Sequence, residues 1–250
     1  MIGVPVPPRR VFGVALSVAG DAGDRTWVCR ATPGADGIRV ESVDRLVDLP
    51  GGIGDRAGAY RALVAKVLEA PRSVWGFDAP FGTAEKPSEP RKTDTSVDRP
   101  VSGRASDLAA VVQRLLLNPL QGHGPVVILP IDALPVLPAG APPAMVARAP
   151  STYVLEVGPE RVLGRLASKS GSDALALITE APGREAVLRE LVAAAQVRPL
   201  ARALRTRIGS DPGAFDAMLC AVAAWRGYRT ADHGLLHADP AFREQGYRYA

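Results

Sequence analysis

An acidic residue stands at the end of an apolar run in SVWGFDAPFG (Ser73–Gly82), where Asp78 follows a segment typical of a buried strand. Burying a carboxylate costs free energy unless the group is paired, hydrogen-bonded or bound to a metal. Asp78 therefore either caps the turn before Pro80 or takes part in chemistry at the carboxyl end of the strand.

Two other acids occupy comparable settings. Glu156 ends the apolar segment of YVLEVGP, and Asp216 lies within the apolar helical pattern of GAFDAMLCAVAAW. Each also has a structural explanation. Glu156 is equally typical of a surface position before a Gly-Pro turn, and Asp216 can cap its helix or pair with an arginine. The residue types alone leave both alternatives open.

The first third of the chain predicts the elements that would position Asp78. Turn signals separate the segments, so we expect three strands at Val11–Gly20, Arg25–Thr32 and Gly37–Leu46. A helix is expected at Asp55–Ala70, ended by Pro71, and a fourth strand at Arg72–Pro80. Short turns between the first three strands predict an antiparallel meander. The helical crossover predicts a fourth strand parallel to the first.

The rest of the chain adds strands and helices. Helical patterns are expected at Asp107–Asn118, Gly183–Gln196, Arg198–Gly209 and Gly213–Tyr228, and strands at Gly124–Pro130 and at the start of Ser151–Ala167. The polar segment 83–106 lacks periodicity, which is typical of a long loop and here of a candidate lid. The pattern predicts an α/β protein with a mixed sheet flanked by helices, formed by one domain over 11–250 after an irregular lead-in over 1–10.

Composition sets limits on partners and compartment. Lysine and arginine exceed aspartate and glutamate by 30 − 26 = 4, a balance that permits phosphate contacts without requiring them. The two cysteines are far apart in sequence and predict neither a disulfide framework nor a thiolate metal site. The sequence has no apolar run of membrane-spanning length and its proline-rich start is a poor signal peptide, so we expect no membrane contact and a cytoplasmic location.

A series of motifs, taken in order from Val11 to Tyr249, resembles the domain of unknown function 429 family of predicted nucleases. The motifs are FGVALS, WGFDAPFG, RKTD, PVSGRASDL, YVLEVGPERVL, AFDAMLCAVAAW and PAFREQGYRY. The resemblance implies a ribonuclease-H-like fold and a metal-dependent nuclease. It also implies that Asp78, Glu156 and Asp216 are the catalytic acids and hold Mg²⁺ or Mn²⁺. Such ions prefer oxygen ligands, and two of them can activate water and stabilise the leaving oxygen.

The chain departs from the family pattern at the first strand, where Ala15 stands in place of the expected aspartate. Alanine offers no lone pair, and Ser17, two residues on, is a neutral and poorer ligand. The departure predicts impaired two-metal catalysis. The alternative is a catalytically inactive module that keeps the fold and binds nucleic acid or a partner.

Positively charged residues suggest how a substrate would be placed. The resemblance implies that Arg91 and Asp94 of RKTD position the substrate, although a solvated loop pair explains them as well. Arg198, Arg202 and Arg205 are spaced i, i+4 and i+7 on a predicted helix, so they would share one face. Such a face suits a nucleic-acid backbone, with Arg202 as a positioning residue, or is simply solvated.

Overall fold

The structure is a computed structural model that describes residues 8–81, 105–121, 126–129, 152–158, 162–163 and 178–230. Its strands are β1 Arg10–Ala15, β2 Trp27–Pro33, β3 Ile38–Arg45, β4 Ser73–Phe77, β5 Val126–Leu129 and β6 Thr152–Glu156. Its helices are α1 Ala22–Arg25, α2 Arg56–Glu69, α4 Ala105–Val112, α5 Asn118–Leu120, α8 Ala181–Ala193, α9 Arg202–Ser210 and α10 Pro212–Thr230, with shorter helical turns η1 Leu46–Asp48 and η2 Gln113–Leu117.

The strands form one mixed sheet in the order β3-β2-β1-β4-β6-β5. The antiparallel meander predicted for the first three strands is confirmed, since β2 pairs antiparallel with both β1 and β3. The predicted parallel pairing is also confirmed, since β4 follows the α2 crossover and pairs parallel with β1. β6 continues the parallel part between β4 and β5. The predicted α/β architecture with a mixed sheet flanked by helices is therefore confirmed, and it agrees with a ribonuclease-H-like arrangement.

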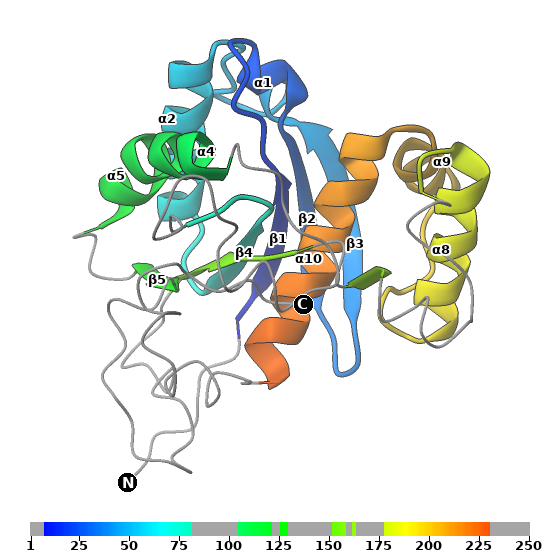
Figure 1. The fold of residues 1–250 in the computed structure, drawn as a ribbon. Helices are drawn as coiled ribbons and strands as arrows, with labels where there is room; N and C mark the ends of the chain where they lie inside the picture. The colour runs from blue at the N-terminus through cyan, green and yellow to red at the C-terminus, as the bar shows by residue number, and fades with distance from the viewer. Residues whose placement is uncertain are drawn as a thin grey trace, which may run out of the picture.

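Helices cover both faces of the sheet (Figure 1). Because strand side chains alternate, Val11 of β1 enters the core under α10, whereas Phe12 and Val14 enter the core under α2 and η2. We call these two sides of the sheet the α10 face and the α2 face. The strand residues of the candidate site are described below by the face on which they lie.

The helix α10 lies unusually close to the central strands. A Cβ added to Gly13 would lie 2.1 Å from the carbonyl oxygen of Ala217, and one added to Gly76 would lie 2.7 Å from the Cβ of Ala224. Glycine on the strands and alanine on the helix are thus what allow the contact. Asp211 caps the first turn of α10, since its Oδ1 accepts hydrogen bonds from the N–H groups of Gly213 (2.8 Å) and Ala214 (3.1 Å).

The prediction that Arg198, Arg202 and Arg205 share one face of a helix is wrong. α9 begins only at Arg202, and Arg198 lies in an extended segment whose N–H donates to the Ile38 carbonyl at 2.8 Å. Pro199 explains the difference, because the residue before a proline is disfavoured in the helical region. Arg198, Arg202 and Arg205 therefore do not share one helix face.

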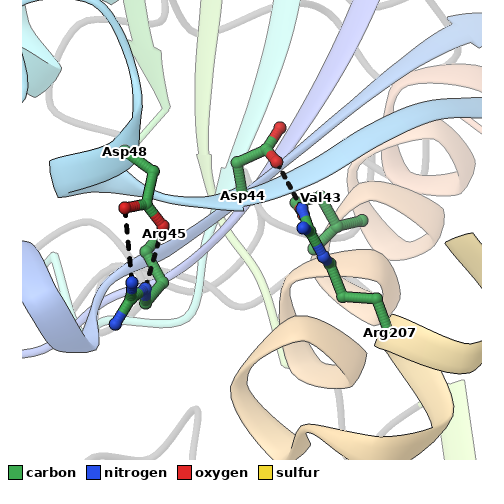
Figure 2. Close-up of polar contacts among 5 residues, drawn as sticks. All are labelled: Val43, Asp44, Arg45, Asp48 and Arg207. Atoms are coloured by element: carbon green, nitrogen blue, oxygen red, sulfur yellow. Dashed lines mark hydrogen bonds and ion pairs between the residues drawn. The ribbon is translucent and has the colours of Figure 1, made fainter.

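Two arginines of α9 join this helix to neighbouring elements. Arg205 pairs with Glu185 of α8 at 2.6 Å. Figure 2 shows Arg207 of α9 reaching the edge strand β3, where it donates to the Asp44 carboxylate (2.6 Å) and the Val43 carbonyl (3.0 Å). In the parts of the chain that the structure describes, no helix is both long and apolar enough to cross a membrane.

Candidate functional site

The carboxyl ends of β1 and β4 bring Ala15 and Asp78 next to each other. The two strands pair Gly13 with Gly76 and Val14 with Phe77, and the Asp78 N–H continues the ladder by donating to the Val14 carbonyl at 3.0 Å. Gly13 and Gly76 both face α10. Two residues further on, alternation places the side chains of Ala15 and Asp78 on that same α10 face.

α10 adds Asp216 to this end of the sheet. Its Gly213 packs on Trp27, the β2 residue paired with Ala15, and its Ala217 packs on Gly13. Asp216 lies between these two contacts, hence at the level of the β1 and β4 ends. The spacing i, i+4, i+8 puts Asp216 on the same side of α10 as Cys220 and Ala224, which contact Gly76 of β4. From this spacing we infer that Asp216 is directed toward the end of β4, where Asp78 stands. Both carboxylates are half-buried.

The β1 side chain beside Asp78 is an alanine. Ala15 is partly buried and packs against the core of the α10 face, so its position is inside the site but offers no ligand. Ser17 does not replace the missing acid. It lies beyond the end of β1, and its hydroxyl accepts a hydrogen bond from the Ala19 N–H at 3.3 Å, a local turn contact.

Glu156 points to the opposite side of the sheet. Its neighbours Tyr153, Leu155 and Val157 belong to the core of the α10 face, whereas Val154 belongs to that of the α2 face, so alternation turns Glu156 to the α2 face. The side chain is fully buried, and its Oε2 accepts a hydrogen bond from the Phe81 N–H at 2.8 Å. Glu156 thus fastens the turn that follows Asp78.

This contact makes a testable prediction for stability. Glu156→Ala is expected to lower the free energy of unfolding by about 2 kcal/mol, because the buried Phe81 N–H loses its acceptor. Glu156→Gln keeps an acceptor oxygen and should cost less. Urea unfolding of the three proteins without metal measures the difference, and equal stability of wild type and Glu156→Ala would contradict the structural role.

On the α10 face, strand register and helical spacing place two acids, Asp78 and Asp216. Within the described residues, no group of three or more His, Cys, Asp and Glu side chains lies close enough to hold a metal ion. Mg²⁺ is commonly held by one or two carboxylates together with water and substrate phosphate. Ala15, the neighbour of Asp78 on β1, adds no third ligand on this face. Asp78, Glu156 and Asp216 each make further interactions.

The predicted positioning residues are only partly placed. Arg91 and Asp94 lie outside the described residues. Arg202 is exposed at the start of α9, whereas it is the far end of α9 that leads into α10 and Asp216. A helix of this length separates Arg202 from that end by roughly 12 Å. Trp27 borders the site beside Ala15. The sequence did not predict this role, because RTWVC carries the pattern of a strand and no further signal.

The cysteines offer no alternative chemistry near this site. Cys29 and Cys220 are both buried in the core of the α10 face. Burial raises the pKa of the Cys29 thiol, which keeps it protonated and unreactive.

Comparisons with known proteins give no family for this chain. A scan against models of protein families found no match, and neither did searches of curated proteins and of solved structures.

Proposed function

We propose that this chain is a divalent-metal-dependent phosphodiester hydrolase of the ribonuclease-H-like class, acting on nucleic acid with a site weakened by Ala15. The observation that carries the proposal is the pairing of the central strands β1 and β4, which with the seating of α10 on Gly13 and Gly76 places Asp78 and Asp216 on one face of the sheet. Ligands of open α/β sheets bind at this edge. The sequence resemblance and the cytoplasmic location expected from the sequence are part of the same proposal.

Each residue has a distinct role in the proposed site. The carboxylates of Asp78 and Asp216 would hold Mg²⁺ or Mn²⁺, which when bound supplies charge stabilisation to a phosphate oxygen and lowers the pKa of bound water. Glu156 is left out of this cation site because its carboxylate lies on the α2 face and holds the Phe81 N–H. By fixing the turn after β4, Glu156 positions Asp78. Arg91 and Asp94 keep the substrate-positioning role that the resemblance implies.

The proposal predicts slow, metal-dependent cleavage that depends on both acids. Labelled single-stranded and double-stranded DNA and RNA are incubated with the protein and Mg²⁺ or Mn²⁺, with EDTA as the blank. Asp78→Asn and Asp216→Asn should each lower the cleavage rate about tenfold or more, since each variant removes one charged ligand of the cation.

The matched control is Asp36→Asn, an exposed acid in the turn between β2 and β3, which should leave cleavage unchanged. Cleavage that persists in Asp78→Asn or Asp216→Asn at the wild-type rate would contradict the assignment of the site.

Ala15 supports one alternative, a catalytically inactive module that binds nucleic acid or a partner with the same fold. It predicts retention of a labelled oligonucleotide by wild type without any cleavage under every metal condition. That result would replace the hydrolase proposal.

A further inference from the structure

A pocket of about 320 Å³ opens on the α2 face, on the other side of the sheet from Asp78 and Asp216. One row of paired residues crosses four strands beneath it. Ser42 of β3 pairs with Arg30 of β2, Arg30 pairs with Phe12 of β1, and Phe12 pairs with Trp75 of β4. Phe12 and Trp75 belong to the core of the α2 face, and all four residues line the pocket.

Positive charge predominates in the pocket lining. Arg10 lies two residues before Phe12 on the same face of β1, Arg30 belongs to the row, and Lys66 comes from α2, whereas Glu69 is the acid among the described lining residues. The Arg30 guanidinium uses its Nε for Glu41 (3.0 Å), and the Lys66 Nζ donates to the Pro50 carbonyl (2.8 Å). These contacts orient both groups, and each group has further N–H donors.

Arg10 differs from the other two cations. Its side chain is exposed and makes no hydrogen bond or ion pair with any other residue that the structure describes. A guanidinium that lines a pocket and has no partner among the described residues can give both of its N–H pairs to a ligand phosphate.

The floor of the pocket is apolar and fixed. The rings of Phe12 and Trp75 stack with centroids 4.0 Å apart and planes 10° apart. The Trp75 indole N–H donates to the Ser73 hydroxyl at 2.8 Å, so its polar atom is satisfied within the sheet. A rigid apolar floor beneath a ring of cations favours a ligand that has both a compact apolar body and an anionic group.

We infer that this pocket binds a small organic phosphate, with the phosphate among Arg10, Arg30 and Lys66 and the organic ring over Phe12. Three cations from three separate elements match a phosphate dianion better than a single carboxylate charge. The volume is that of the smaller ligand sites in proteins, which limits the ligand to about the size of a mononucleotide. The site is independent of the proposed metal centre, since it lies on the opposite face of the sheet.

The test is calorimetric titration of the full chain with uridine monophosphate, uridine and inorganic phosphate in EDTA, so that the proposed cation site cannot contribute. Uridine monophosphate should bind with a dissociation constant below about 1 mM and more tightly than either of its parts. Arg10→Glu should weaken this binding about tenfold or more, because it removes one charge-assisted contact and adds a repulsive charge.

Arg61→Glu is the matched control, because Arg61 is an exposed arginine of α2 that does not line the pocket. Its binding should stay within about twofold of wild type. Lys66→Gln provides a second variant with the same expected weakening as Arg10→Glu, and thermal melting checks that all variants fold. Three results would overturn the inference. The first is that uridine monophosphate does not bind, and the second is that uridine or inorganic phosphate binds as tightly as uridine monophosphate. The third is that Arg10→Glu and Arg61→Glu change the binding equally.

Discussion

Ala15→Asp is expected to raise the affinity for Mn²⁺ about tenfold or more and to accelerate cleavage of nucleic acid. Strand register puts the new carboxylate next to Asp78 and beneath the first turn of α10, on the face that Asp216 shares. A third carboxylate raises the charge of the ligand set, which tightens binding of a hard cation. Without metal the three like charges repel, so the variant should melt at a lower temperature than wild type and recover when Mn²⁺ is added.

Calorimetric titration with Mn²⁺ and thermal melting with and without the ion measure both effects. Ala15→Asn is the matched control, since its side chain has nearly the same shape but adds no charge, and it should change Mn²⁺ affinity far less. Equal Mn²⁺ affinity of wild type and Ala15→Asp would show that Ala15 does not lie within reach of the proposed cation.

Gly13→Ala is expected to be the most destabilising single-methyl substitution in the sheet. The added Cβ would lie 2.1 Å from the Ala217 carbonyl oxygen and 2.2 Å from the Ala221 nitrogen, both backbone atoms of α10. Backbone cannot rotate away, so α10 has to shift off the sheet. We expect a loss of about 3 kcal/mol or more in the free energy of unfolding, and weaker metal binding because Asp216 moves with the helix.

Gly20→Ala is the matched control for Gly13→Ala, because a Cβ at Gly20 meets no atom within 4 Å. It should leave stability nearly unchanged in urea unfolding. If Gly13→Ala unfolds at the same urea concentration as Gly20→Ala, the close contact between β1 and α10 is wrong, and with it the placement of Asp216.

Much of the fold is predictable from local signals. Turn residues between β1, β2 and β3 and the α2 crossover to β4 are enough to derive the meander and the parallel pair. The prediction of three arginines on one helix face was wrong because Pro199 keeps Arg198 out of the helix. The short helix α1 was not predicted, because four residues carry no periodicity.

The face of Glu156 could not be derived from the sequence. β6 is a parallel strand buried on both sides, so the residues of TYVLE show no alternation of apolar and polar side chains. Only the pairing of β6 with β4 and its packing against α10 determine which residues face which layer. The position of Asp78 was easier to predict, because its place beside the end of β1 follows from the parallel crossover.

The pocket on the α2 face could not be predicted from the sequence either. The row of paired residues beneath it draws on four strands, and only the sheet register aligns its members, which are Ser42, Arg30, Phe12 and Trp75. No motif or spacing along the chain marks such a row, because cross-strand neighbours are distant in sequence.

The metal site is tested most directly by a crystal of the wild-type protein soaked in Mn²⁺, with the ion located by its anomalous scattering. We predict one manganese peak, bound by the carboxylates of Asp78 and Asp216 on the α10 face, with water in its other positions. A peak at Glu156 on the α2 face, or no peak between Asp78 and Asp216, would contradict it.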